Sequence, residues 1–256
     1  MDVLYEFKKQ LIKIGIKKGD KIVLVLDFLK FYLVAKKNKK KIITDDLINI
    51  FVDLVGDTGT LVFNTFSWDF IKKKKFDYKQ TKSIGGSLSN RSLLRHDFKR
   101  TKHPIYSFSV FGKHQKKMCK INSTDSFGSS SVFVYMIKNN FKYLSVGVPL
   151  NSGFAFVHVA EQEAKVEYRY KKYFSGQYIN HFGESENKTC SMFVRNTKLS
   201  KGTRSTKMFY NYLVDKKVAK KKIFYELDVN IFDLMKVHKL MIKDLKSKRQ
   251  FITNLR

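Results

Sequence analysis

A strand, a helix and a second strand are predicted in residues 21–66, which read KIVLVLDFLKFYLVAKKNKKKIITDDLINIFVDLVGDTGTLVFNTF. The first six residues are an apolar, β-branched run of the kind that forms a buried strand. Thr44 and Asp45 can cap a helix whose apolar positions share one face: Leu47, Ile48, Phe51, Leu54 and Val55. That helix ends at the glycine turn 56–59, and 60–66 forms the second strand. This β-α-β order indicates an α/β fold.

Helices and strands continue to alternate on both sides of this segment. Residues 2–16 form an amphipathic opening helix that stops at Gly19, and their apolar positions have helical spacing: Leu4, Phe7, Leu11 and Ile14. Residues 105–111 (IYSFSVF) alternate as a strand, 131–138 have a helical pattern, and 142–148 (KYLSVGV) are predicted to be another strand. The rhythm therefore extends to about residue 150.

The remaining segments show no sign of a second domain. The polar, lysine-rich stretch 68–102 is predicted to be a long irregular loop over the surface. From residue 166 onward, the pieces VEYRYKKYF, CSMFVRN and KIFYELDV are separated by polar turns, which predicts hairpins, and residues 230–246 form a closing helix. No repeat or change in composition divides the chain, so residues 1–256 are expected to be one domain.

The net charge of +29 raises nucleic acid or an anionic membrane surface as a partner. However, the sequence has 43 lysines and only 8 arginines, and many lysines fall in runs such as 39–41, 72–75 and 220–222. Arginine is the usual residue for recognising phosphates and bases, so this composition indicates solvated lysine faces. A basic nucleic-acid or membrane-surface protein remains an alternative, without specific nucleic-acid recognition.

Other function classes lack their usual signals. No apolar run is long enough to span a membrane, and the N-terminus has charged residues where a signal peptide would be hydrophobic, so a cytoplasmic location is expected. Cys119 and Cys190 are too few for a disulfide framework or a zinc site, and no metal is expected. The sequence contains no Walker A loop, dinucleotide-binding loop, H-E-x-x-H or G-x-S-x-G motif.

The most specific candidates for catalysis are His158 and Glu161, in FVHVAEQE. Residues three apart on a helical turn share a face, so the carboxylate can orient the imidazole. Histidine titrates near neutrality and can accept a proton from an attacking amine while the glutamate stabilises the imidazolium. The same spacing is also common in structural histidines.

Two serine clusters are candidates for ligand binding. The turn GSSS at 128–131 precedes an apolar helical stretch, where backbone N–H groups and hydroxyls can bind a phosphate or simply cap the helix. Ser107 and Ser109 lie two apart in a predicted strand, so both hydroxyls point to one face, toward a cleft or toward solvent.

Several segments, in order, resemble the aminoglycoside 3-N-acetyltransferase family, including relatives from sugar biosynthesis. The likeness spans residues 10–176, and R-T-x-H-P-x-x-S and H-x-x-E are its most specific elements. The matching segments are IGIKKGDKIVLV at 14–25, GDTGTLVFNTFSW at 56–68, GGSLSN at 85–90, RTKHPIYSFSVFG at 100–112, DSFGSSSVF at 125–133, FVHVAE at 156–161 and VEYRYKKYFSG at 166–176.

This resemblance implies one α/β domain with a central mixed sheet flanked by helices, acetyl-CoA or another short acyl-CoA as donor, and no metal. It makes His158 the general base and Glu161 its support. The residues it assigns to the cofactor are Thr65, Ser67, Ser107, Ser109, Gly128, Ser129 and Ser131. Those expected to bind the acceptor are Asp69, Arg100, His103 and Tyr168.

Two positions depart from the family pattern. The family often has proline where this chain has Asn64, and a His-Ser pair after the first strand where this chain has Val25, Leu26 and Asp27. The resemblance therefore does not carry cofactor contacts over to the loop after the first strand.

The acceptor is predicted from charge. Aminoglycosides are polycations, which a strongly basic protein would repel, whereas a nucleotide-linked amino sugar carries a diphosphate. We therefore expect N-acylation of a nucleotide-linked amino sugar in surface-polysaccharide biosynthesis, with antibiotic inactivation as the alternative. Neither cysteine lies in a nucleophile motif, so direct transfer between bound substrates is expected. The protein is expected to be a monomer or a homodimer.

Overall fold

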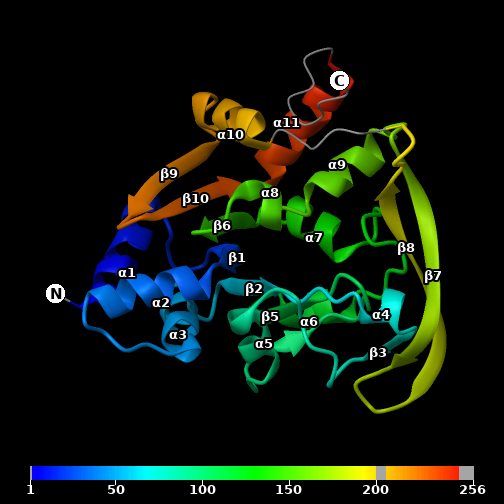
Figure 1. Cartoon of the computed structure of the whole chain (residues 1–256), viewed down its shortest axis with the longest axis horizontal. Helices are drawn as coiled ribbons and strands as arrows, with labels where there is room; N and C mark the ends of the chain where they lie inside the picture. The colour runs from blue at the N-terminus through cyan, green and yellow to red at the C-terminus, as the bar shows by residue number, and fades with distance from the viewer. Residues whose placement is uncertain (1, 200–205, 248–256) are drawn as a thin grey trace.

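The computed structural model describes residues 2–199 and 206–247, which form a mixed sheet between two layers of helices, with a smaller sheet at one end (Figure 1). The helices are α1 (Val3–Ile14), α2 (Phe28–Lys37), α3 (Thr44–Val55), α4 (Asp69–Lys72), α5 (Ser87–Leu93), α6 (Gln115–Lys120), α7 (Val132–Lys138), α8 (Leu150–Gly153), α9 (Val157–Glu163), α10 (Thr206–Asp215) and α11 (Leu234–Lys246). The strands are β1 (Lys21–Leu26), β2 (Thr60–Asn64), β3 (Lys75–Asp77), β4 (Lys99–Arg100), β5 (Phe108–Gly112), β6 (Lys142–Val146), β7 (Arg169–Ile179), β8 (Ser185–Arg195), β9 (Ala219–Phe224) and β10 (Leu227–Asp233).

The main sheet is parallel at its centre and antiparallel at both edges. Its strand order in the described residues is β4-β5-β2-β1-β6-β10-β9. Strand β1 pairs in parallel with β2 and β6, whereas β5 and β10 run antiparallel to their neighbours. The central mixed sheet expected from the family resemblance is confirmed.

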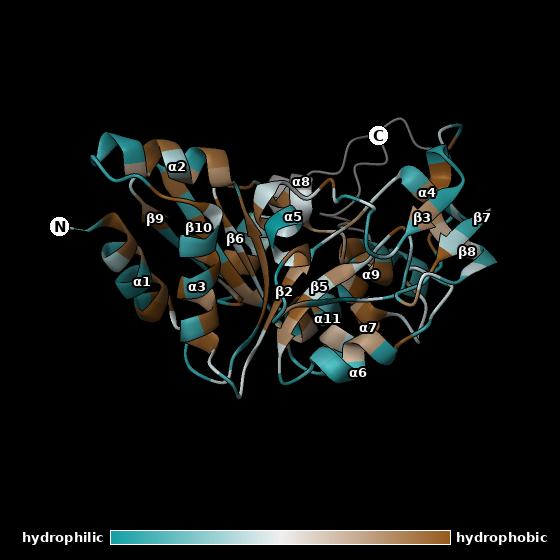
Figure 2. Ribbon diagram, turned by 90° about the horizontal axis from the view of Figure 1, so that it is seen from below, coloured by the Kyte–Doolittle hydropathy of each residue, from teal (hydrophilic) through white to brown (hydrophobic). Residues whose placement is uncertain are grey.

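Side-chain alternation along the central strands divides the core into two clusters, one on each face of the sheet. Ile22 and Leu24 of β1 pack with the apolar faces of α1, α2 and α3, whereas Val23 packs with α7, α9 and α11 on the other face. Figure 2 shows these two helix layers on opposite sides of the sheet, with hydrophobic ribbon concentrated between them. A sheet covered on both faces explains why residues 22–26 (IVLVL) are all apolar.

The smaller sheet consists of β3, β7 and β8, with the long β7–β8 hairpin at one end of the molecule (Figure 1). Gly176 allows β3 to approach β7, because a Cβ atom there would lie 2.6 Å from the carbonyl oxygen of Lys74. Ser126 ties the hairpin to the segment before α7 by donating from its backbone N–H and its hydroxyl to the carbonyl of Ser191.

The predicted β-α-β unit is confirmed as β1, α3 and β2, and the predicted helix at 131–138 is confirmed as α7, capped by Ser131. The opening helix was predicted to stop at Gly19, but it ends at Ile14 because Gly15, with φ 106°, closes it. The strand predicted at 105–111 pairs only from Phe108.

Two further predictions need correction. The closing helix begins at Leu234, because Leu227–Asp233 pair with β6 and β9 as strand β10, and Asp233 caps the helix. The stretch 68–102 is not wholly irregular, since it contains α4, β3, α5 and β4. Helix α2 was not predicted, although Asp27 caps it and Phe31, Val34 and Ala35 form its buried face. Within the described ranges, no helix is long and apolar enough to cross a membrane.

Candidate active site

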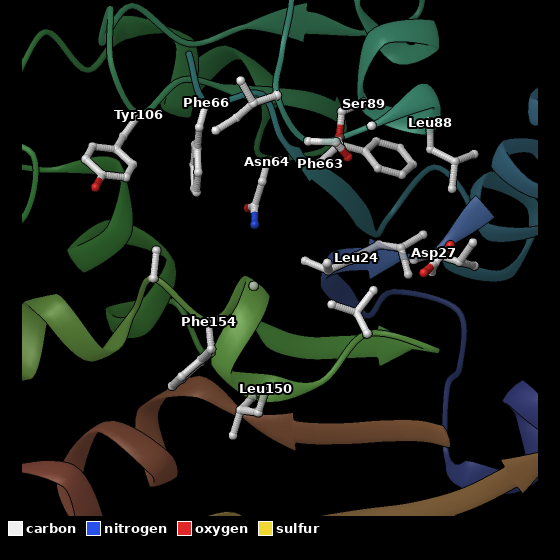
Figure 3. A pocket seen from close by; sticks show the side chains of 18 of the residues that line it. Leu24, Asp27, Phe63, Asn64, Phe66, Leu88, Ser89, Tyr106, Leu150 and Phe154 are labelled. Atoms are coloured by element: carbon white, nitrogen blue, oxygen red, sulfur yellow. Dashed lines mark hydrogen bonds between the residues drawn. The ribbon is translucent and has the colours of Figure 1, made fainter. Parts of the chain in front are cut away.

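An apolar cavity of about 650 Å³ lies at the carboxyl ends of the parallel strands β1, β2 and β6. Ligands of α/β sheets typically bind at this edge. Figure 3 shows Phe66 and Tyr106 on one wall and Leu150 and Phe154 on the facing wall. The segment 84–89, which contains the glycine pair 85–86, lines another side.

His158 lines this cavity from α9, and its side chain is 14% exposed. Its Nδ1 lies 2.6 Å from Oε2 of Glu161, one helical turn away. The ring also contacts the edge of Phe127, with 5.1 Å between the ring centroids. The structure therefore brings together the histidine and glutamate that the sequence paired, at the wall of a cavity.

Glu161 is completely buried, and three groups converge on its carboxylate. Oε2 accepts from His158 and forms an ion pair with Arg169, whose Nε lies 2.8 Å away; the hydroxyl of Tyr168 donates to Oε1 at 3.2 Å. An ionised carboxylate can only accept, so Nδ1 of His158 carries the hydrogen and the basic lone pair is on Nε2. This arrangement suits a general base.

Tyr168 was expected to bind the acceptor, but it lies against Glu161 and not among the described cavity-lining residues. Arg169 was not predicted. A buried carboxylate requires a positive partner, so the arginine next to Tyr168, in a segment shared with the family, was the available signal.

Arg100, Thr65 and Ser107 form an internal network outside the cavity lining. The Arg100 guanidinium donates to the backbone carbonyls of Thr65 (3.1 Å) and Thr81 (2.6 Å) and to the Ser107 hydroxyl (2.9 Å). Burial lowers the pKa of Arg100 to about 10, and Phe76 covers it at 4.6 Å. Thr65 and Ser107 are fully buried and bonded to each other at 3.0 Å. These contacts hold loops together, and the roles of Thr65 and Ser107 at the cofactor and of Arg100 at the acceptor stay predictions.

His103 has a similar internal role. Its Nδ1 accepts from the backbone N–H groups of Ile105 (3.2 Å) and Tyr106 (3.1 Å), and its Nε2 lies 3.3 Å from the Ser126 hydroxyl. Burial lowers the pKa of His103 to about 3, so the ring is neutral at physiological pH. It fixes the turn that presents Tyr106 to the cavity, and it does not line the cavity itself.

The other predicted cofactor and acceptor residues also lie outside the described cavity lining. Ser131 is buried and caps α7, accepting from Val134 N–H at 3.3 Å, and the neighbouring Gly128 and Ser129 belong to the same turn. Ser67 accepts from the backbone N–H of Asp69, whose carboxylate pairs with Lys73 at 3.1 Å. Ser109 is buried in β5, and its hydroxyl has no hydrogen-bond partner among the described residues.

The charge of the cavity differs from that of the whole chain. Of the described residues that line it, Asp27 has the only carboxylate and none is a lysine or an arginine. Asp27 caps α2 and lies 3.4 Å from the ammonium of Lys30. The expectation that a basic protein repels cationic acceptors therefore does not follow at this site.

A second cavity of about 1370 Å³ adjoins the first and shares Val148 and Leu150 with it. Its described lining includes four lysines: Lys30, Lys36, Lys37 and Lys221. Two are paired with carboxylates of the same cavity, Lys37 with Glu226 at 2.6 Å and Lys221 with Asp228 at 2.9 Å. The first, apolar cavity is thus adjacent to a second cavity that has more basic residues in its lining.

One family model matches most of this chain. The family model described as aminoglycoside 3-N-acetyltransferase matches residues 36–246. A search of curated protein sequences gives no match.

Solved structures give the same fold at low sequence identity. The structure of AAC-IIIb in a binary complex with CoASH superposes with a TM-score of 0.79 at 15% identity, covering 95% of this chain and 96% of that one. AAC-VIa with bound sisomicin gives 0.79 at 15% identity, with coverages of 95% and 97%. YokD protein from Bacillus subtilis gives 0.74 at 17% identity, with coverages of 94% and 92%.

The hydrogen bonds of Arg100 predict that its substitution lowers the stability of the protein and leaves acceptor binding unchanged. Arg100→Lys removes the planar fork, leaves buried carbonyls unpaired, and should lower the free energy of unfolding by at least about 2 kcal/mol. Denaturant unfolding measures this change, and Arg91→Lys, at an exposed ion pair with Asp45, is the control that should change it little. A rise in the acceptor KM with unchanged stability would instead restore Arg100 as an acceptor-binding residue.

Proposed function

Because the chain belongs to the aminoglycoside 3-N-acetyltransferase family and is therefore an acyl-CoA-dependent acetyltransferase, we propose that it acetylates an amine of a cationic amino sugar of the aminoglycoside class, with His158 as general base. The observation that carries this proposal is the His158–Glu161 pair in the wall of a cavity at the carboxyl ends of the parallel strands.

The amine of an amino sugar is largely protonated at neutral pH, so its nitrogen needs a base before it can attack. Nε2 of His158 accepts that proton, and the carboxylate of Glu161 holds the ring and stabilises the imidazolium. Acetyl-CoA supplies the thioester carbonyl: the N–C bond forms and the C–S bond breaks. Of the two protons that the ammonium nitrogen loses in becoming an amide, one is released to solvent and the other protonates the leaving thiolate. The acetamide and CoA are the products, and neither cysteine is required.

Arg169 influences the charge of the His158–Glu161 pair through its ion pair with Glu161. Its guanidinium shares Oε2 of Glu161 with the imidazole, so the carboxylate stays ionised while burial removes it from water. The arginine charge also disfavours a second positive charge on His158. We assign Arg169 a positioning role that keeps His158 in its neutral, basic form.

The two cavities fit the parts of the acyl donor. The apolar chamber beside His158 suits the acyl group and pantetheine arm, and the adjoining lysines suit phosphates. Lys36 would hold the phosphates there together with Lys30, Lys37 and Lys221, which would exchange their carboxylate partners for phosphate oxygens. The shared residues Val148 and Leu150 give a continuous path between the two cavities.

The acceptor class rests on the family and on the local charge. A cavity whose described lining has a carboxylate and no lysine or arginine accommodates an ammonium better than the net charge suggests. The second candidate is a nucleotide-linked amino sugar, which the lysines of the adjoining cavity favour. The direct nucleic-acid or membrane-surface function is set aside, because the family is enzymatic.

Removal of the general base should abolish most of the turnover. His158→Ala is expected to lower kcat by about a hundredfold to ten-thousandfold. Calorimetric affinity for CoA should change little, and His96→Ala, at an exposed histidine, should behave as the unmodified protein. A His158→Ala enzyme that retains its kcat would refute the assignment.

Removal of the positive charge beside Glu161 should shift the pH dependence of the reaction. In Arg169→Met the His158–Glu161 pair takes up a proton at higher pH, so the acidic limb of the kcat/KM profile moves up by roughly one pH unit. Arg169→Lys, which keeps the charge, should move it less. An unchanged limb with a lowered Tm would mean that Arg169 is only structural.

The acceptor can be identified by thiol release from acetyl-CoA. We expect kcat/KM for aminoglycosides to exceed that for nucleotide-linked amino sugars by at least about tenfold. Resistance of a sensitive bacterial host carrying the protein should follow the same order. A preference for the nucleotide-linked acceptors would support the second candidate and reject the first.

A further inference from the structure

Asn64 presents an unsatisfied amide to the cavity. It is the last residue of β2 and is 9% exposed, and its Oδ1 has no hydrogen-bond partner among the described residues. Figure 3 shows its amide nitrogen reaching into the space between Phe66 and Phe154. By contrast, the Ser89 hydroxyl on the same lining donates to the carbonyl of Gly85 at 3.2 Å.

A buried polar group without a partner is rare in proteins, and such groups concentrate at functional sites. An apolar residue at position 64 would pack in this chamber without that cost. The unpaired Oδ1 makes this amide unfavourable for folding, and its other end, Nδ2, is the part that faces the cavity. The donor that reaches the cavity, Nδ2, selects an acceptor oxygen as its partner.

The Asn64 amide lies on the face of the sheet that is covered by α9, the helix that carries His158. Val62, Asn64 and Phe66 alternate with Phe63, and Val62 and Phe66 pack in the cluster that contains α9. Phe63 instead belongs to the cluster of α1, α2 and α3. Asn64 thus projects toward the side of the sheet from which His158 enters the same cavity.

We propose that Nδ2 of Asn64 donates a hydrogen bond to the acyl oxygen during transfer. This inference rests on the proposed acetyl transfer. As the amine nitrogen bonds to the carbonyl carbon, the carbonyl π electrons move onto this oxygen; they return when the C–S bond breaks, the thiolate leaves with the bonding pair, and the amine proton passes through His158. An asparagine donor in this apolar chamber stabilises the charge that develops on the oxygen.

The test uses a ketone analogue of acetyl-CoA in which a methylene is inserted between the sulfur and the carbonyl carbon, labelled with ¹³C at the carbonyl. The carbonyl resonance should move downfield on binding to the unmodified protein, and this shift should be lost in Asn64→Ala and in Asn64→Asp. Acetyl transfer by both variants should fall by about a hundredfold or more in kcat, with little change in KM for acetyl-CoA. Asn187→Ala, on the exposed hairpin, is the matched control.

Asn64→Leu separates catalysis from folding. It should keep or raise the Tm, because it removes an unpaired buried amide, and still lose the carbonyl shift and the turnover. The proposal is overturned if the carbonyl resonance of the bound analogue is the same with and without the Asn64 amide, whatever happens to kcat. If the unmodified protein does not bind the analogue in calorimetry, the proposed function itself fails, and this inference fails with it.

Discussion

A carboxylate that has lost all contact with water organises the catalytic side of this molecule. Burial of Glu161 is favourable only if its charge is compensated, and the structure compensates it with an imidazole, a phenol and a guanidinium. Tyr168 and Arg169 come from the start of the β7 hairpin, whereas His158 shares α9 with the glutamate. The contacts that compensate the charge of Glu161 therefore link β7 to α9, and they hold the imidazole of His158 at the cavity wall.

Net charge and local charge lead to different conclusions about the acceptor. The sequence carries +29, yet the described lining of the first cavity contains one carboxylate and no lysine or arginine. Exposed lysines are screened by salt within about 10 Å, so their sum says little about a sheltered chamber. The basic groups that we propose for phosphate binding are the lysines of the adjoining cavity.

The sequence predicts the α/β order and the His158–Glu161 pair because both depend on local spacing. Alternating strands and helices follow from periodicity, and residues three apart in a helix must share a face. Arg100, His103 and Ser107 were predicted to contact a ligand, and the structure shows each of them bonded to backbone groups, which a shared motif does not reveal. Asn64 and Arg169 were missed for the converse reason: their significance depends on burial and on a neighbour distant in sequence.

The cavity is assembled from nearly the whole length of the chain. Its lining begins at Leu24 in β1 and ends at Met241 in α11, with contributions from most of the segments between them. During synthesis, the three parallel strands β1, β2 and β6 and His158 leave the ribosome before the helix that completes the chamber. A nascent chain therefore holds its base and its carboxylate well before it can shelter a thioester from water, and competence for transfer arises only after translation has passed residue 241.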